Sequence, residues 1–576
     1  MALFTPSASP AITVKEIDLT GGVPNVQSTT GAFAGAFSWG PVDEPILISN
    51  EAGLVRTFGA PSNEEAVDLI SASYFLKYSN SMYVVRTTTD AAKNAIAKAG
   101  GVSVTATLVK NDADFSNLQS SLDSDNHLFI AQYAGKLGNS LKVSFCQDSS
   151  NFATWTYKNE VSGKPGTSAS VAAVNGKNDE FHLVVLDEDG LITGTKGTVL
   201  ESFEYLSKAK DQKNEDGSTS YAPEVINRKS QYIRMAGWSA SAFPTNAGDS
   251  SSGTDFRNAS YLTNTNYSFD GGQNSGTLTN ALLDSAYSVF DDTDKYEIDF
   301  MIAPQVKTRA NHKTLVGNLI SKAENTRKDC VVVSSPPRDD VVDLSASDAV
   351  TATVAAMNDI TFSSYAVFDN AFLKVYDKFN DKYIWIPAAS STAGIMAASD
   401  ANTAPWFSPA GPRRGRYFGI TGLSYSPDKA QRDTLYKAGI NPIANIPGQG
   451  VLLYGDKTHM TRVSAFDRIN VRRLFLILER AIARAAVNTL FEFNDEFTRA
   501  EFVNIVEPVL RNVKGRRGIT DFRVVCDETN NTADVIDRNE FIASIFIKPA
   551  RSINYITLNF VGVRTGVDFE EVVGTV

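Results

Sequence analysis

The segment closest to a known chemical motif is a glycine-containing loop at residues 450–458. Its sequence, GVLLYGDKT, approaches the phosphate-binding loop, in which a lysine directly after the second glycine meets phosphate oxygens together with backbone N–H groups. Here Asp456 separates Gly455 from Lys457, and a carboxylate at that point repels a phosphate. An α/β enzyme such as an NTPase or hydrolase is therefore kept only as an alternative from another functional class.

Other residues with catalytic or metal-binding chemistry are scattered along the chain. Asp187, Asp189 and Gly190 open a calcium-type loop, but its later oxygen ligands are missing. Each histidine lacks a second histidine or a glutamate at helical spacing, which leaves a zinc site or a catalytic triad unsupported. The residues concerned are His127, His182, His312 and His459. We therefore predict that the protein is not an enzyme and has no catalytic, metal-binding or cofactor-binding residue and no cofactor.

Composition predicts a large, folded, mildly acidic protein. The chain has 576 residues, 43% hydrophobic and 21% charged, which suits several packed domains. A net charge of −11 argues against a globally basic nucleic-acid-binding surface. The first residues show no secretory signal, which favours synthesis in a cytoplasm, and no run of about 18 apolar residues predicts a membrane span. The three cysteines are too dispersed for a zinc motif and are expected to be buried thiols.

Positive charge gathers in the last third of this acidic chain. Residues 468–491 predict a long helix with one apolar side and with Arg473, Arg480 and Arg484 aligned on another side. A second basic cluster contains Lys514, Arg516 and Arg517. One interpretation is a solvated face or a set of internal ion pairs, and the other is a docking surface for an acidic protein. Nucleic acid is disfavoured because no aromatic residues alternate with these charges.

The elements that position these residues form an α/β pattern at two distant places in the chain. A helix lies between two predicted strands in the early region, and the same order recurs later. The strands are expected at residues 46–48, 82–86, 298–304 and 331–333. We predict one discontinuous α/β core domain made of residues 24–88 and 284–403.

The remaining segments are expected to surround that core. Residues 89–283 are rich in Ser, Thr, Asn, Asp and Gly and contain short alternating strands, which predicts inserted outer β-rich domains. Residues 404–552 are assigned to a C-terminal domain, and residues 1–23 and 553–576 to extended terminal arms next to glycines. The predicted fold class is therefore a multidomain α/β and α+β protein with β-rich insertions and two arms.

Several blocks of sequence occur in an order known from one protein family. In the front half they are VKEI at 14–17, GAFAG at 31–35, WGP at 39–41 and YVVR at 83–86; later come GPRRG at 411–415, LYKAGINPI at 435–443, YGDKT at 454–458, NVRRL at 470–474 and FEFN at 491–494. The chain resembles the tail sheath protein of contractile-tailed, myovirus-type bacteriophages. No block matches within residues 89–283, as expected of a variable outer insertion, and the first arm residues depart from the usual opening.

The resemblance implies a structural protein of the virion tail with no enzymatic step. Such a protein polymerises as a helical, six-start sheath of hexameric rings around an inner tail tube, and contraction drives the tube through the host envelope for genome ejection. The implied partners are further copies of the chain, the inner tail tube protein, and baseplate and tail terminator proteins, with no direct nucleic acid and no membrane insertion. Assembly is expected in the host cell cytoplasm. The alternative within structural proteins is the sheath of a phage-derived contractile injection system.

The same resemblance implies two sets of contact residues. Neighbouring copies are expected to be linked by strand exchange, in which the arms complete a sheet in the next subunit. The arm strands are represented by Ile12, Val14, Ile17, Ile556, Leu558, Phe560, Val567 and Phe569. The residues expected to face the tube, through exposed and screened contacts, are Arg473, Arg480, Arg484, Lys514, Arg516 and Arg517.

Overall fold

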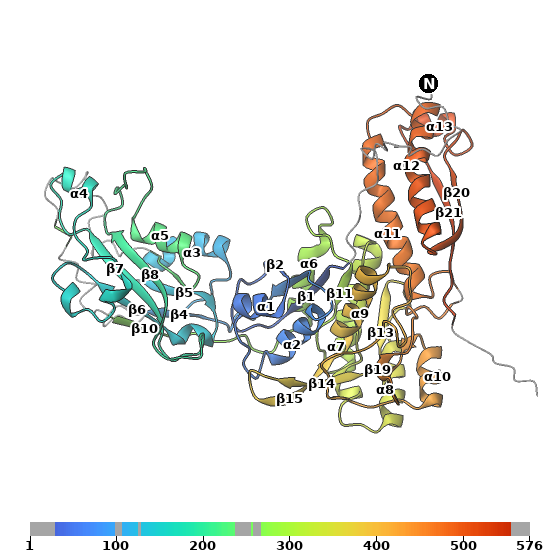
Figure 1. The fold of residues 1–576 in the computed structure, drawn as a ribbon, viewed down its shortest axis with the longest axis horizontal. Coiled ribbons are helices and arrows are strands. Elements are labelled where there is room, and N and C mark those ends of the chain that lie inside the picture. Colours follow the sequence, from blue (N-terminus) through green and yellow to red (C-terminus); the bar gives the residue numbers. More distant parts are fainter. Residues whose placement is uncertain are drawn as a thin grey trace, which may run out of the picture. The chain divides into compact units, whose positions relative to one another are not determined.

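The computed structural model describes residues 29–97, 106–124, 128–236, 255–256, 266–462 and 464–553. The chain separates into a large unit, Asn25–Ala481, and a small unit made of Met1–Pro24 and Ile482–Val576. The predicted arm at residues 1–23 and all but the first residue of the arm at 553–576 lie outside the described residues, as do all eight arm residues named above. Figure 1 gives the element labels used below.

The large unit is built on a seven-stranded sheet in the order β17-β13-β12-β11-β1-β3-β2. Every neighbouring pair in it is parallel except β2 with β3, which is antiparallel. The strands are β1 (Gly31–Gly35), β2 (Pro45–Ile48), β3 (Met82–Arg86), β11 (Phe300–Ile302), β12 (Val331–Ser334), β13 (Ala366–Asp369) and β17 (Ile440–Asn441). Strands from both predicted parts of the core therefore pair directly, since β1 lies between β11 and β3.

Helices cover both faces of this sheet, which explains why its strands are almost continuously apolar. Successive residues of a strand point to opposite faces, so Val332 packs in one core while Val331 and Val333 pack in the other. The first core is covered by α6 (Asn280–Ser288), α7 (Arg309–Ser321), α8 (Ala346–Asn358) and α10 (Lys429–Lys437). The second is covered by α1 (Glu51–Phe58), α2 (Ala66–Leu76), α9 (Ala389–Asn402) and α11 (Ile469–Ala486).

The segment between β3 and α6 folds as a separate antiparallel sheet in the order β8-β7-β6-β10-β4-β5-β9. Its strands are β4 (Asn94–Ala97), β5 (Phe129–Ala134), β6 (Leu141–Cys146), β7 (Glu180–Asp187), β8 (Thr198–Ser207), β9 (Ile233–Arg234) and β10 (Asn266–Asp270), with helices α3 (Asp112–Ser124), α4 (Ala169–Ala173) and α5 (Ala222–Lys229). It has its own apolar core, which includes Phe129, Phe145 and Phe181. These elements fall within the predicted insertion, residues 89–283.

The predicted boundary after residue 403 needs a correction. Strand β17 pairs with β13 through Phe368 and Ile440, so residues beyond 403 belong to the core sheet, and the large unit continues to Ala481. Sequence periodicity missed this because β17 has only two residues. Two smaller sheets also belong to this unit: β14 (Phe372–Asp377) with β15 (Lys382–Pro387) and β16 (Gly422–Leu423), and the hairpin β18 (Ile443–Ile446) with β19 (Gly450–Leu453).

The small unit, in its described residues, contains α12 (Glu496–Gly515), β20 (Ile519–Val525), α13 (Ala533–Asp537) and β21 (Ser544–Pro549). Helix α12 begins after Asp495, whose carboxylate accepts the backbone N–H of Thr498 at 2.8 Å, a standard N-cap. Its buried residues Phe502, Val506 and Leu510 recur every fourth position and form one apolar face. The structure combines a central sheet covered by helices on both faces, an inserted β domain and this α+β unit. The predicted multidomain α/β and α+β fold class is therefore confirmed.

Candidate functional site

The loop that resembled a phosphate site is closed by an internal ion pair. Residues 450–453 are strand β19, and the Asp456 carboxylate that follows is 4% exposed. It lies 2.8 Å from the Arg468 guanidinium and accepts the Tyr436 hydroxyl at 3.0 Å. The Lys457 ammonium donates to the Tyr436 carbonyl oxygen at 2.7 Å. Both charged side chains of the motif therefore hold their own loop in place.

The histidines His312 and His459 are buried inside the large unit. His312 is 1% exposed, and its Nε2 lies 2.9 Å from the Ser335 carbonyl oxygen. Burial lowers the pKa of His312, and likewise that of His459, to about 4. Within the described ranges, no three His, Cys, Asp or Glu side chains converge as metal ligands would. In the same ranges no helix is both long and apolar enough to span a bilayer.

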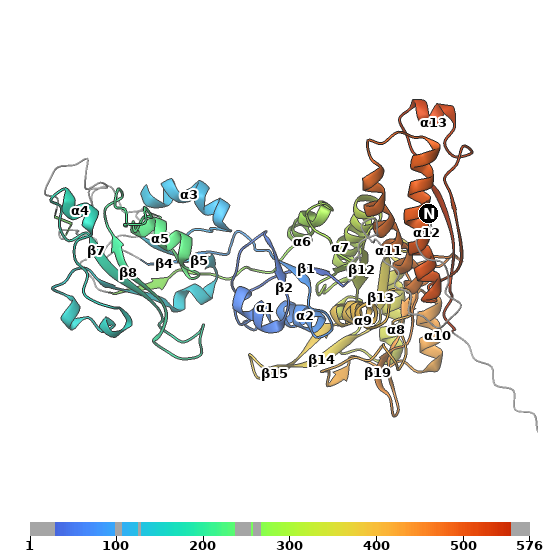
Figure 2. The same ribbon diagram turned by 45° about the horizontal axis from the view of Figure 1, so that its top comes forward.

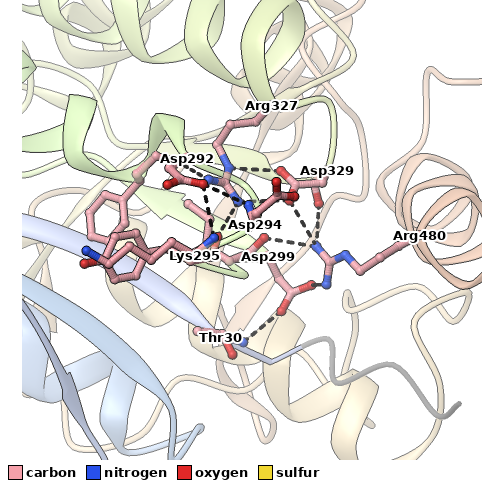
Figure 3. A network of polar contacts seen from close by, with 11 residues as sticks. Thr30, Asp292, Asp294, Lys295, Asp299, Arg327, Asp329 and Arg480 are labelled. Carbon is pink, nitrogen blue, oxygen red and sulfur yellow. Dashed lines mark hydrogen bonds and ion pairs between the residues drawn. The ribbon is translucent and has the colours of Figure 1, made fainter. Parts of the chain in front are cut away.

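A buried ion-pair network occupies the amino-terminal edge of the central sheet (Figure 3). Thr30, Asp299 and Asp329 each lie one or two residues before a parallel strand, and Arg480 reaches them from α11. The Arg480 guanidinium lies 2.8 Å from the Asp299 carboxylate and donates to the Asp329 carbonyl oxygen at 2.9 Å. The other Asp299 oxygen accepts the Thr30 backbone N–H at 3.0 Å. Burial raises the pKa of Asp299, and the Arg480 charge opposes that shift.

Asp329 receives a second arginine in this network. The Arg327 Nε and Nη2 groups donate to its two carboxylate oxygens at 3.0 and 2.9 Å, a bidentate pair. Arg327 Nη2 also donates to the Tyr296 carbonyl oxygen at 2.8 Å. The network therefore ties Arg480 of α11 to the residues just before β1, β11 and β12.

Arg473, about two turns earlier on α11, is also internal. Its guanidinium forms an ion pair with Asp400, and both side chains are less than 5% exposed. The guanidinium carbon lies 4.1 Å from the centre of the Phe300 ring, a cation–π contact. The prediction that Arg473 and Arg480 are exposed contacts to a tube is wrong, because both charges are buried against carboxylates of the same chain. The aligned arginines Arg473 and Arg480 therefore form internal ion pairs, which was one of the two interpretations of the sequence pattern.

The other four predicted contact residues are more accessible. Arg484 is half-buried near the end of α11, and Arg516 and Arg517 are exposed just after α12. Lys514 pairs with Asp521 at 3.0 Å, and its side chain is 47% exposed. These residues keep the exposure that a releasable contact requires, although no described contact tests that role.

The most open surface of the small unit is its sheet. Strands β20 and β21 pair only with each other among the described residues. Ile519 is the one buried residue in the two strands, and Phe546 on β21 is 60% exposed. A two-stranded sheet with so little burial is marginal in isolation. Both outer edges offer backbone groups to a further strand.

Exposed apolar side chains concentrate in the same unit. Nine of the seventeen exposed large apolar residues of the described chain fall within residues 487–553. Phe491, Phe493 and Phe497 are 105%, 83% and 78% exposed. Sequence reasoning used 491–494 only as a family block, although two phenylalanines in a polar loop were a signal of surface function.

Comparison with protein families decides what kind of molecule this is. Three family models match: the phage tail sheath protein central domain over residues 276–459, the phage tail sheath C-terminal domain over 461–561, and the tail sheath protein Gp18 domain III N-terminal region over 28–87. The tail sheath protein of Enterobacteria phage T4 is 32% identical over 98% of this chain and 99% of its own length. The chain belongs to the phage tail sheath family.

Two further relatives give the same result across almost the whole length. The tail sheath protein of Vibrio phage KVP40 is 31% identical, over 98% of this chain and 99% of its own. The tail sheath protein of Salmonella phage ViI is 32% identical, over 99% of this chain and 98% of its own. The resemblance read from the sequence blocks is therefore confirmed, and the protein is a structural, contractile tail sheath component.

Solved structures agree on the fold. A sheath tail protein from Listeria innocua superposes with a TM-score of 0.54 and 11% identity, covering 92% of this chain and 96% of that one. A sheath tail protein from Desulfitobacterium hafniense gives 0.53 and 12%, covering 94% and 100%. At these identities the likeness concerns the fold alone.

Proposed function

We propose that copies of this chain polymerise as a helical, six-start sheath of hexameric rings around an inner tail tube, and that the sheath contracts to drive the tube through the host envelope. Membership of the tail sheath family supports the class of assembly. The observation that carries the proposal for this chain is the unfinished β20–β21 sheet, which among the described residues has two unpaired edges and only one buried residue.

In this proposal, the terminal arms of neighbouring copies complete that sheet. Residues 12–15 and 556–560 alternate apolar and polar side chains, which suits a strand that presents one face to a core. Each added strand contributes several backbone hydrogen bonds of about 0.5–1.5 kcal/mol net. Its apolar side chains cover residues such as Phe546. The links hold while the larger units move as rigid bodies.

The contact with the tube is assigned to four of the predicted basic residues: Lys514, Arg516 and Arg517, which are exposed, and Arg484, which is half-buried. Exposed ion pairs contribute only about 0–1 kcal/mol each, which suits contacts that must be released during contraction. Baseplate and tail terminator proteins are the proposed partners at the two ends of the sheath. No nucleic acid contact, membrane insertion or enzymatic step is part of the mechanism, and assembly takes place in the host cytoplasm.

The free energy for contraction is then stored in the packing of copies against one another. The phosphate-like loop does not supply an alternative, because its Asp456 and Lys457 are both engaged within the fold. A sheath of this kind works once, by conversion from an extended to a shorter and more stable arrangement.

The proposal is tested by trimming the arms. Purified full-length protein is compared by negative-stain electron microscopy and pelleting with variants that lack residues 1–23, residues 554–576, or both. We expect cylinders from the full-length chain, fewer from each single truncation and none from the double truncation. Thermal unfolding serves as the control, since the large unit should melt unchanged. Cylinders formed at the wild-type concentration by the double truncation would refute strand exchange.

A further inference from the structure

One face of the hairpin β14–β15 carries two accessible tyrosines and a lysine beside Trp385, which is partly buried against the first core. We call Lys374, Tyr376, Tyr383 and Trp385 the basic aromatic face. Lys374 lies opposite Trp385, and Tyr376 opposite Tyr383, in the antiparallel register. The rings of Tyr376 and Tyr383 are 5.5 Å apart, and both side chains are about half exposed. The Lys374 ammonium lies 5.7 Å from the Trp385 ring and 5.8 Å from the Tyr383 ring.

The opposite face of the same hairpin is already packed. Leu373, Val375 and Ile386 are fully buried in a core shared with α2 and α9. On the basic aromatic face Trp385 also packs against the first core, whereas Tyr376 and Tyr383 remain accessible. Figure 2 shows β14 and β15 side by side below α2. Tyrosine and tryptophan side chains at an accessible surface are among the residues that contribute most to protein interfaces.

Lysines gather around this face, together with Asp381, which accepts the Tyr376 hydroxyl at 2.7 Å. Lys378 and Lys382 lie at the hairpin end, where Lys378 pairs with Glu51 at 3.2 Å and Lys382 bonds to Asn63. Lys374 has no ion-pair partner among the described residues, and Gly422 on β16, its neighbour on the other side, has no side chain to cover it. Nearby Asp377 is fully buried and bonds to the hairpin turn. A partner that covers the face should therefore bring carboxylates to Lys374.

The chain itself carries a segment of the complementary chemistry. Residues 527–540 contain five acidic residues and one arginine. Arg538 pairs with Glu540 at 2.9 Å, which leaves the other carboxylates as a net negative set. Asp534 and Asp537 are exposed, and Ile536 between them is 39% exposed, so acid and apolar groups are presented together. This combination fits a surface of aromatic rings with a lysine among them.

We propose that the basic aromatic face of one copy binds the acidic segment 527–540 of a second copy. The inference rests on the proposed function, because only a polymer brings many copies into regular contact. The Lys374 ammonium meets the Asp534 or Asp537 carboxylate, while Tyr376, Tyr383 and Trp385 cover Ile536. Complementary charge at such a contact sets register and speeds association more than it adds affinity.

The first experiment uses charge reversal and its rescue. Lys374→Glu should raise the concentration needed for polymerisation by about three-fold, and Asp534→Lys should do the same. The double variant Lys374→Glu/Asp534→Lys should return toward wild type, because the pair is restored with opposite signs. Lys164→Glu, an exposed lysine of the inserted domain, is the matched control and should have no effect. Additive losses in the double variant would overturn the proposal.

The second experiment locates the contact directly. Lys374→Cys and Asp534→Cys are made separately in a Cys526→Ser background and then mixed under mild oxidation. A disulfide-linked dimer should appear only in the mixture, and Lys164→Cys in place of Lys374→Cys should give none. Equal yield with the control, or no dimer in assembled cylinders, would overturn the inference. Wild-type protein that forms no cylinders would instead refute the proposed function, so the two failures are distinguishable.

Discussion

The large and small units of this sheath protein differ in which side chains they bury and which they expose. The large unit buries even charged groups, as in the pairs Arg480–Asp299 and Arg473–Asp400. In the described part of the small unit, Phe491, Phe493 and Phe497 are exposed, and only one residue of strands β20 and β21 is buried. The core of the large unit is thus complete within one chain, whereas the small unit has the surface of a protein that is completed by assembly. Each prediction below tests one side of this contrast.

The largest effect is expected from the buried network of the large unit. Arg480→Ala leaves the Asp299 carboxylate buried without its closest cation, and Asp329 keeps only Arg327. Removing one partner of a buried ion pair typically costs about 3–5 kcal/mol. We expect a loss of that size in urea unfolding of the large unit. Arg516→Ala, at an exposed site, is the control and should change stability by less than about 0.5 kcal/mol. Equal effects would contradict the contrast.

Parts of this contrast were predictable from sequence and parts were not. The family, the α/β strands and the inserted β domain followed from local periodicity, composition and short blocks of residues. The burial of Arg473 and Arg480 in ion pairs could not be predicted, because their partners Asp400 and Asp299 are distant in the chain. Helical spacing shows that arginines share a side but not what lies opposite it. Strand β17 was missed for a related reason, since two residues show no period and only pairing with β13 reveals them.

Acid should act on the large unit through its buried histidines. The pKa of His312 is about 4 in the folded chain against an ordinary 6.5, so the unfolded chain binds the proton first as pH falls. The stability that neutral His312 contributes is therefore lost between about pH 6.5 and 4, by roughly 3 kcal/mol. His312→Gln should lower stability at neutral pH and narrow its deficit relative to wild type at pH 4.5. The free energy of unfolding of both proteins is measured in urea across that pH range. A constant difference between wild type and variant at every pH would contradict the prediction.

Asp369 provides a matched test of opposite sign. Burial raises its pKa to about 7, and the Thr392 hydroxyl donates to its carboxylate at 3.0 Å. The folded chain holds this proton more tightly than the unfolded chain, so the wild type loses stability as pH rises from about 4 to 7. Asp369→Asn does not titrate and should gain stability relative to wild type over the same range. A variant that instead falls further behind as pH rises would show that the carboxylate is stabilised where it lies.

Substitutions on the accessible surface of the small unit should weaken polymerisation but hardly change the stability of the unassembled chain. Phe546→Asp places a charge on the accessible side of β21, where a donated strand is proposed to bring apolar side chains. Burial of a phenylalanine side chain contributes about 1.5–3 kcal/mol, so we expect polymerisation to require at least about ten-fold more protein. Thermal unfolding of the unassembled chain should shift little, since the side chain is 60% exposed. Leu191→Asp, in an exposed position of the inserted domain, is the control.

The smallest effect is expected at the proposed tube contact. Arg516 and Arg517 are exposed, so reversal of both to Glu should leave the folded chain intact. A screened contact of this kind contributes about 0.5 kcal/mol, which predicts a loss of about five-fold in co-assembly on purified tubes for the pair. Raising the salt concentration should reduce the difference between variant and wild type, because the contacts are screened. Self-assembly of sheath without tubes should be unchanged, and a loss there would place these arginines between copies of the chain instead.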